Sequence, residues 1–223
     1  KFSLYLDLTV AENIEFYGGV YGLGEERIEE RKKWILEMAD LKGRERSLTG
    51  ELAGGWKQRL ALGCAVLHEP DIVFLDEPTG GVDPISRRNF WELINGLSEG
   101  GTTIFVTTHY LDEAEYCGNI MLIQAGKIVA GGSPQQLKTE HIRNPMLEVE
   151  CDDVIAAMEL LGKEDWVLET SVFGTYIHLS VVDEENAKSK TGQLLESKGI
   201  GLKRIERIMP SLEDVFIHVV ENK

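Results

Sequence analysis

The chain has 223 residues, of which 43% are hydrophobic and 27% charged, and its formal net charge is -15 at pH 7. This length allows one large or two small domains with a buried core. The negative charge disfavours direct binding to nucleic acids and to anionic lipid headgroups, because both present phosphate groups. The three cysteines have no paired spacing, which argues against a disulfide framework or a zinc site: Cys64, Cys117 and Cys151.

Helical periodicity dominates the first third of the chain. Apolar residues recur at helical spacing from Thr9 to about Leu23, and Thr9 with Glu12 forms a predicted capping box at the start of that helix. A second amphipathic helix is predicted over Glu25–Leu41. A third runs over Trp56–Leu67 and ends just before Pro70, which cannot continue a helix.

The pattern then changes to alternating strands and helices. The β-branched and aromatic run Asp71–Asp76 predicts a strand buried on both faces, and Thr103–Thr107 predicts another buried strand. A helix is predicted between them over Arg87–Leu97. A short helix over Leu111–Tyr116 and a hairpin around Gln124–Gly126 follow. This order predicts an α/β domain with a parallel sheet.

A predicted linker near Arg143–Pro145 separates this region from a segment with a different order of predicted elements. The segment has the order β-α-β-β-α-β, which is typical of the ferredoxin-like arrangement, and it ends in a helix over Leu212–Val220. The predicted strands are Met146–Cys151, Trp166–Ser171, Tyr176–Val182 and Gly201–Ile208, and the predicted helices between them are Val154–Leu161 and Glu184–Ser197.

Two adjacent carboxylates, Asp76 and Glu77, lie at the end of the first predicted strand. Open α/β sheets bind ligands at the carboxyl ends of their strands. In nucleotide hydrolases an aspartate at such a place helps to hold Mg²⁺, and an adjacent glutamate can polarise the attacking water as a general base. Taken alone, however, the pair could equally be two solvated carboxylates at a strand end.

Two neighbouring features strengthen the functional interpretation. The segment Ala53–Gln58 places two glycines at the start of a helix, where exposed amides and the helix dipole suit a phosphate. An isolated pair of glycines would more often serve only a turn. The next predicted strand leads to His109, which is therefore expected at the same sheet edge as Asp76 and Glu77.

In this order and spacing, the segments resemble the ATPase subunit of an ABC transporter. Leu52–Gln58 resembles the family signature, Val73–Pro78 the Walker B motif, Gly80–Asp83 the D-loop and His109 the switch histidine. The similarity runs from Phe2 to about Leu137. The later segment Pro210–Phe216 is similar to the C-terminal extension of drug-exporter-type members.

The resemblance implies ATP and Mg²⁺ as cofactors and ATP hydrolysis that powers transport. By this resemblance Asp76 is the metal residue, and Glu77 and His109 are catalytic. Two copies, or one copy and a related ATPase subunit, would pair head to tail around two nucleotides. The residues implied to bind nucleotide are Ala53, Gly54, Gly55, Gln58 and Asp83.

The resemblance also implies a transmembrane permease subunit as partner and a peripheral location on the cytoplasmic face of the cell membrane. The opening segment, Ser3–Asn13, resembles the part of the family that follows the Q-loop and faces the membrane subunit. We expect contact with that subunit through Thr9–Leu23.

The chain departs from the family pattern in three places. Ala53 stands where the signature normally has serine, and Gly80-Gly81-Val82 replaces the usual Ser-Gly-Leu of the D-loop. The sequence also has no Gly-x-x-x-x-Gly-Lys-Ser/Thr, the loop that cradles the β- and γ-phosphates. We therefore expect an N-terminally truncated chain that holds half an active site and is inactive alone.

The predicted fold is an α/β partial P-loop NTPase domain over residues 1–142, with a helical subdomain over about 9–68. A small α+β ferredoxin-like domain follows over residues 146–223. Two functions remain open: an ATPase in the intact protein, or a non-catalytic module that binds a partner or dimerises through the C-terminal domain. That domain could stabilise a dimer by packing or could regulate.

Overall fold

The computed structural model describes residues 4–221, and the side chains of residues 4–220. The beginning of the family resemblance at Phe2 and Ser3, and the outer limits of the predicted domains at residues 1 and 223, lie outside the described residues. The chain divides into two compact units, unit 1 over residues 1–109 and unit 2 over residues 110–223. Each unit is described by itself below.

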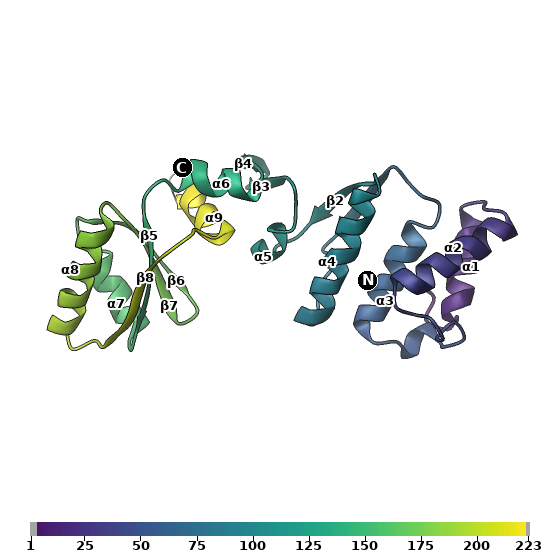
Figure 1. Ribbon diagram of the computed structural model, residues 1–223, viewed down its shortest axis with the longest axis horizontal. Helices are drawn as coiled ribbons and strands as arrows, with labels where there is room; N and C mark the ends of the chain where they lie inside the picture. The colour runs from purple at the N-terminus through teal and green to yellow at the C-terminus, as the bar shows by residue number, and fades with distance from the viewer. Residues whose placement is uncertain (1–3, 222–223) are drawn as a thin grey trace. The chain divides into compact units, whose positions relative to one another are not determined.

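The first part of unit 1 consists of three helices that share a core (Figure 1). These are α1 (Val10–Val20), α2 (Glu25–Met38) and α3 (Gly54–Ala65), with a short 3-10 helix over Thr49–Glu51 before α3. The predicted capping box at the start of α1 is confirmed, because the Thr9 hydroxyl accepts the Glu12 amide at 3.2 Å and the Glu12 carboxylate accepts the Thr9 amide at 2.8 Å. Fully buried side chains of this core include Ile14, Ile35, Leu41, Leu60 and Leu67.

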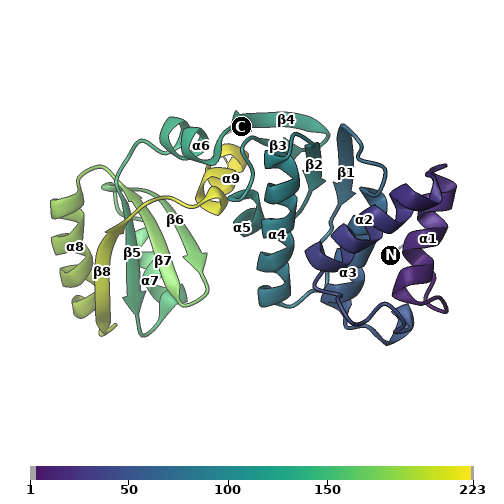
Figure 2. The same ribbon diagram turned by 45° about the vertical axis from the view of Figure 1, so that its right-hand side comes forward.

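A parallel strand pair follows in unit 1, as the alternating pattern predicted. Strand β1 (Ile72–Asp76) pairs with β2 (Thr103–Thr107), and α4 (Pro84–Glu99) connects them (Figure 2). The expectation that both strands are buried on both faces is wrong. Phe74 is 77% exposed and stacks on Phe105, which is 49% exposed, whereas Val73 is buried. In the described sheet of two strands, helices cover only one face, so every second side chain stays exposed.

Unit 2 opens with α5 (Leu111–Ala114) and the predicted hairpin, formed by β3 (Ile120–Gln124) and β4 (Lys127–Gly132). Helix α6 (Pro134–His141) comes next, and it was not predicted from the sequence. Its signal was present in the sequence: Ser133 and Gln136 form a complete capping box, and proline occupies the first turn.

The rest of unit 2 contains the predicted ferredoxin-like arrangement. Four antiparallel strands form a sheet in the order β6-β7-β5-β8, with the helices α7 and α8 against the apolar face of the sheet (Figure 2). The elements are β5 (Met146–Cys151), α7 (Val154–Leu161), β6 (Val167–Phe173), β7 (Tyr176–Val181), α8 (Glu184–Ser197) and β8 (Leu202–Ile208).

The last helix, α9 (Leu212–Glu221), joins the two parts of unit 2. Its apolar side chains Leu212, Val215 and Val219 share a core with α5, α6 and the β3–β4 hairpin. On the side of the antiparallel sheet, Asp214 bonds to His178 of β7 with 2.8 Å between the carboxylate oxygen and Nδ1. These contacts group residues 110–142 with the C-terminal sheet, and their assignment to the ATPase domain stays a prediction.

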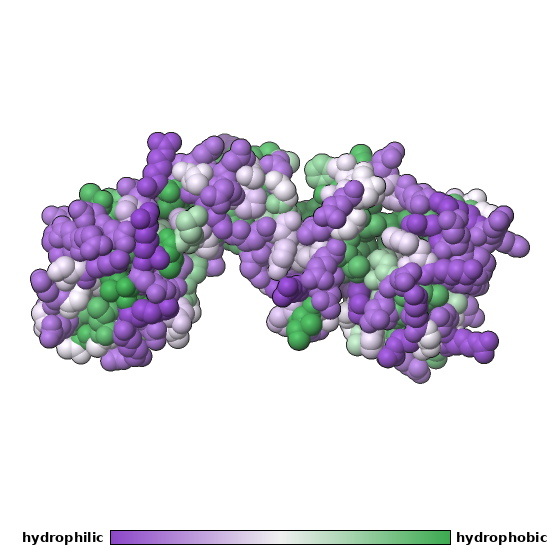
Figure 3. All heavy atoms as spheres, viewed as in Figure 1, coloured by the Kyte–Doolittle hydropathy of each residue, from purple (hydrophilic) through white to green (hydrophobic). Residues whose placement is uncertain are grey.

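The visible surface of each unit is mostly hydrophilic and carries smaller hydrophobic patches (Figure 3). Across residues 4–221, no helix combines the length and the apolar character needed to cross a membrane.

Candidate functional site

The carboxylate Asp76 ends β1 and lies opposite Thr107, the last residue of β2. The Thr107 hydroxyl donates to the Asp76 carboxylate with 2.5 Å between the oxygens. A carboxylate that accepts a hydrogen bond at a strand end has a fixed orientation, and its second oxygen is still available to a ligand. The two strand ends therefore hold Asp76 in place at the sheet edge.

Glu77 leaves the strand through a sharp change of backbone direction. Its φ is 42°, in the left-handed region that non-glycine residues adopt at a cost of roughly 1–3 kcal/mol. Its amide donates to the Thr107 carbonyl at 3.0 Å, which anchors the turn to β2. Because the backbone turns here, the Glu77 side chain stands away from the pleat of β1 and is 56% exposed.

The predicted switch histidine lies beside this glutamate. Nδ1 of His109 is 3.2 Å from Oε1 of Glu77, and both side chains are more than half exposed. An ion pair of that exposure contributes little to stability. The structure thus brings Asp76, Glu77 and His109 together at the carboxyl end of two parallel strands, as the sequence predicted.

The turn after Glu77 leads into α4. Thr79 is buried, and its carbonyl accepts the Val82 amide at 3.2 Å, while Gly81 takes a φ of 74°. Asp83 is the N-cap of α4, and its carboxylate accepts the amides of Ile85 at 3.1 Å and Ser86 at 3.0 Å. The D-loop segment is therefore a short ordered turn between a strand and a capped helix.

The signature segment forms the N-terminus of α3. Ala53 is the N-cap residue and has no side-chain cap, while its carbonyl accepts the amides of Trp56 and Lys57 at 3.1 Å. Gly54 is exposed and Gly55 is partly exposed. The first-turn amides of a helix have no acceptor within the helix, so this end offers donors to an anion.

Gln58, the fourth predicted nucleotide contact in this segment, is placed differently. Its side chain is only 6% exposed, and its Oε1 has no hydrogen-bond partner within the described residues. A buried amide oxygen without a partner is costly, on the order of 1–3 kcal/mol. The arrangement leaves Gln58 beneath the surface of α3, so its role in nucleotide binding stays a prediction.

Two residues of this region were not found from the sequence. Thr107 orients Asp76 and anchors Glu77, and Ser86 lies between Asp83 and Gly55. Both depend on which residues the strand register and the helix packing bring together. The only sequence signal for Thr107 was its place at the end of the strand that leads to His109.

The donor set suits a magnesium nucleotide better than a free-standing metal site. Mg²⁺ takes carboxylate oxygens and commonly keeps waters and substrate phosphates as its other ligands. Asp76 supplies such an oxygen in a fixed orientation. Within residues 4–221 no group of three or more His, Cys, Asp or Glu side chains could hold a metal by itself. Waters and phosphate oxygens of a nucleotide would complete the coordination shell.

Two family descriptions match parts of the chain. Residues 1–80 match "ABC transporter", and residues 132–220 match "ATP-binding protein DrrA1-3-like, C-terminal domain". Among solved structures, cbiO1 from Clostridium perfringens, part of the ABC transporter complex cbiONQ, is 28% identical with a TM-score of 0.56. That match covers 63% of this chain and 57% of the solved one.

Curated relatives extend the similarity to nearly the whole chain. The chain is 34% identical to a Nod factor export ATP-binding protein I of Rhizobium, with 97% of this chain and 69% of the relative covered. It is 32% identical to the daunorubicin resistance ATP-binding protein DrrA3 of Streptomyces coeruleorubidus, with 96% and 68% covered.

A higher identity covers a shorter segment. The probable multidrug ABC transporter ATP-binding protein YbhF of Escherichia coli is 52% identical over 140 residues, which are 63% of this chain and 24% of that protein. The aligned part thus spans about a quarter of YbhF. With its strand-end carboxylates, its glycine-led helix and its ferredoxin-like C-terminal region, the chain belongs to the ATP-binding proteins of the ABC transporter family.

Proposed function

We propose that this chain works in an ATPase that powers export through a membrane partner. The observation that carries the proposal is the gathering of Asp76, Glu77 and His109 at the carboxyl end of β1 and β2. A carboxylate that Thr107 orients, beside an exposed glutamate–histidine pair that contributes little to stability, is expected at a site that binds and hydrolyses a nucleotide.

Each of the three side chains has a separate task in this proposal. Glu77 accepts a proton from the attacking water, and its left-handed backbone turns the carboxylate out of the sheet for that purpose. His109, 3.2 Å from Glu77, orients that carboxylate and donates to the terminal phosphate. Asp76, fixed by Thr107, would hold Mg²⁺, which neutralises charge on the phosphates when bound.

The signature segment would act on a nucleotide held by a second ATPase subunit, either another copy of this chain or a related one. Amides at the start of α3, at Gly54 and Gly55, point to where an anion would bind. Ala53 has no hydroxyl to donate to the γ-phosphate, so we expect this contact to be weaker than in relatives with serine by about 1–3 kcal/mol. Asp83, at the end of the D-loop, is the last of the residues that we propose to bind the nucleotide.

The partner on the membrane side would be a permease subunit, and the contact would lie on α1 and the segment before it. This surface exposes apolar and aromatic side chains: Tyr5, Leu6, Phe16, Val20 and Tyr21 are all between 38% and 61% exposed. Tyr5 and Phe16 pack edge to face with 4.7 Å between their rings. Aromatic side chains gathered on one face favour a protein partner. Contact there would put the ATPase on the cytoplasmic face of the membrane.

Export, and not import, is favoured by the relatives and by the C-terminal region. Several relatives carry export or drug resistance in their names, and the C-terminal match is to a DrrA-like domain. We propose that the C-terminal domain stabilises the ATPase dimer. Loss of dimerisation on deletion of residues 146–223 would support this role, and an unchanged dimer would favour a regulatory one.

The experiment that tests catalysis needs a phosphate-binding loop, which these 223 residues do not contain. We define the loop-containing protein as these residues preceded by a family segment that carries Gly-x-x-x-x-Gly-Lys-Ser/Thr. In that protein, Glu77→Gln should abolish ATP hydrolysis while Mg-ATP still binds. Hydrolysis equal to that of the unmodified protein would rule out Glu77 as the base.

The 223-residue chain provides the matched measurement. Because its sequence has no Gly-x-x-x-x-Gly-Lys-Ser/Thr loop to cradle the β- and γ-phosphates, we propose that it binds Mg-ATP only weakly and does not turn it over. Isothermal titration of this chain with Mg-ATP should show no binding in the micromolar range. Binding in that range would contradict the claim that the 223-residue chain cannot hold a nucleotide by itself.

A further inference from the structure

Two parts of the proposed site, the signature turn and the D-loop, meet at one side chain of α4. A Cβ atom added to Gly55 would lie 2.7 Å from Oγ and 2.9 Å from Cβ of Ser86. Such distances are strongly repulsive, so only glycine lets the start of α3 lie this close to α4. The neighbouring Gly54 has nothing within 4 Å of an added Cβ, so the close approach is a property of Gly55.

Ser86 is at the same time bonded to the end of the D-loop. Its amide donates to the Asp83 carboxylate at 3.0 Å, next to the Ile85 amide at 3.1 Å. Hydrogen bonds from the side chain and the backbone of Ser86 hold the pKa of the Asp83 carboxyl below its ordinary value. One side chain therefore touches the signature glycine and fixes the D-loop aspartate.

We infer that Ser86 is a positioning residue for ATP hydrolysis, because it transmits the position of Gly55 to Asp83 within one chain. In the proposed dimer, a phosphate that binds the amides of Gly54 and Gly55 pulls on the start of α3. Since Gly55 and Ser86 leave no space between them, α3 cannot shift toward α4 without displacing Ser86, and Asp83 moves with it. This inference rests on the proposed function, because it gives the contact a role only where a nucleotide binds the signature segment.

The contact itself is tested in the 223-residue chain, without nucleotide. Gly55→Ala should push Ser86 away, and NMR hydrogen exchange of the Ile85 and Ser86 amides should become at least fivefold faster. The double variant Gly55→Ala/Ser86→Gly has space for the new methyl group and should give exchange rates within twofold of Ser86→Gly alone. Gly96→Ala is the matched control, since this α4 glycine has nothing within 4 Å of an added Cβ. It should leave both amides unchanged.

The functional role is tested by ATP hydrolysis in the loop-containing protein. Gly55→Ala should lower kcat about tenfold, and Ser86→Gly about threefold with KM for ATP unchanged within twofold. The double variant should recover to within twofold of Ser86→Gly, whereas Gly96→Ala should retain full activity. If Gly55 serves only to leave room for the phosphate, the double variant will stay as slow as Gly55→Ala, and the inference is overturned.

A parallel Glu77→Gln variant separates the two claims. Full activity of Glu77→Gln would reject the catalytic assignment, whatever the Ser86 variants do. An inactive Glu77→Gln combined with no recovery in the double variant would reject the Ser86 inference alone.

Discussion

Thr107 donates a hydrogen bond to Asp76 across two parallel strands, with 2.5 Å between the oxygens. The same residue accepts the Glu77 amide through its backbone carbonyl at 3.0 Å. One residue of β2 thus orients the proposed metal-binding carboxylate, Asp76, and anchors the turn that carries the proposed base, Glu77. The geometry of both carboxylates depends on the register between β1 and β2, in which Asp76 faces Thr107.

Replacing Thr107 by valine should remove the hydrogen bond that orients Asp76 without weakening the strand. Valine has nearly the same shape and a high strand propensity, so only the hydroxyl is lost. We expect Thr107→Val to lower the free energy of unfolding of the 223-residue chain by no more than about 1 kcal/mol, because the bond is exposed. In the loop-containing protein, it should raise the Mg²⁺ concentration for half-maximal activity several-fold. Urea unfolding and Mg²⁺ titration of ATP hydrolysis are the measurements.

Thr107→Ser is the matched control, because serine retains the hydroxyl. It should require nearly the same Mg²⁺ concentration as the unmodified protein. Equal Mg²⁺ dependence of the valine and serine variants would show that the hydrogen bond does not affect the metal site.

Local signals explain how much of the fold could be predicted from the sequence. Helices α7 and α8 begin where predicted because Asp153 and Asp183 each cap a helix with their own side chain. The gathering of Asp76, Glu77 and His109 was predictable, since parallel strands end at one sheet edge. Helix α6 was missed although Ser133 caps it, because the helix buries a single residue, Leu137, and so has little apolar periodicity.

Features that depend on packing could not be predicted in the same way. The exposure of Phe74 and Phe105 depends on whether one face or both faces of the sheet are covered. The same apolar run in the sequence is compatible with either arrangement. The contact between Gly55 and Ser86 requires two helices to meet at a defined point. No local pattern in either helix encodes that meeting.

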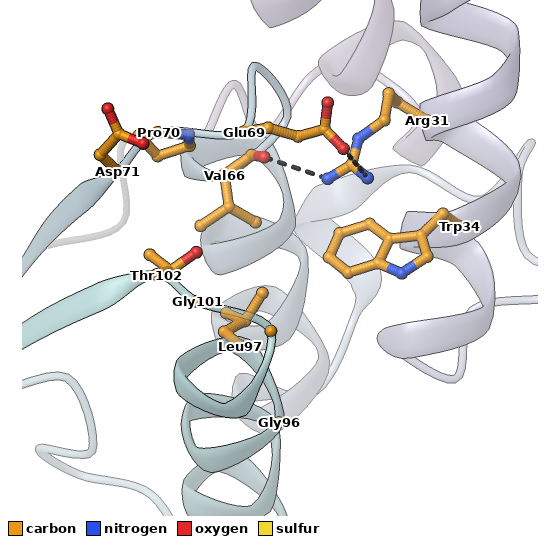
Figure 4. Close-up of a pocket in the computed structure, with 11 residues that line it drawn as sticks. Arg31, Trp34, Val66, Glu69, Pro70, Asp71, Gly96, Leu97, Gly101 and Thr102 are labelled. Carbon is orange, nitrogen blue, oxygen red and sulfur yellow. Dashed lines mark hydrogen bonds and ion pairs between the residues drawn. The ribbon is translucent and has the colours of Figure 1, made fainter.

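Arg31 should be a main stabilising residue of unit 1. Its side chain is 11% exposed and donates to the carbonyls of Val66 (Figure 4) and Leu67, each at 3.2 Å. It also pairs with Glu69 at 3.1 Å and stacks over Trp34. Arg31→Ala removes the donor to the Leu67 carbonyl and one of the two donors to the Val66 carbonyl, which still accepts the Glu69 amide at 3.0 Å. We therefore expect a loss of about 1–3 kcal/mol in the free energy of unfolding. Chemical denaturation followed by circular dichroism measures it.

Arg27 offers a matched comparison, because it also pairs with Glu69 but is 41% exposed. Arg27→Ala should cost less than about 1 kcal/mol, as exposed ion pairs usually do. Arg31→Lys should not restore stability, since an ammonium group cannot reproduce the planar fork that contacts two carbonyls and a carboxylate. Equal losses for both alanine variants would show that only the pairing with Glu69 matters.

The attachment of α9 to the antiparallel sheet should weaken at acid pH, because it depends on the ionised carboxylate of Asp214. Burial alone would raise the pKa of this carboxyl, but hydrogen bonds from His178 and Ser211 outweigh it and hold the pKa below its ordinary value. A lowered pKa contributes stability above the unfolded value of about 4, and this contribution is lost as the pH falls through the folded pKa. Unit 2 should therefore lose stability progressively below about pH 4.

The variant Asp214→Asn isolates this contribution. Near neutral pH it should lower the free energy of unfolding by about 1–3 kcal/mol, and the difference from the unmodified chain should shrink below about pH 4. Asp183→Asn is the control, because asparagine caps α8 about as well as aspartate does. Urea unfolding between pH 2.5 and pH 7 measures both, and a pH-independent difference for Asp214→Asn would contradict the assignment.

The adjacent glycines of α1 should respond to alanine with opposite signs. A Cβ added to Gly18 would lie 2.6 Å from Cγ1 of Ile28 in α2, whereas one added to Gly19 would have nothing within 4 Å. Gly18→Ala therefore overpacks the contact between the two helices and should cost about 1–3 kcal/mol. Gly19→Ala should instead stabilise the chain by about 0.5–1 kcal/mol, because alanine loses less backbone entropy in a helix. Thermal unfolding of both variants is the measurement. In an Ile28→Ala background, which removes the opposing Cγ1 and Cδ1 atoms, Gly18→Ala should cost less than in the unmodified chain. A cost that stays the same would show that Ile28 is not its cause.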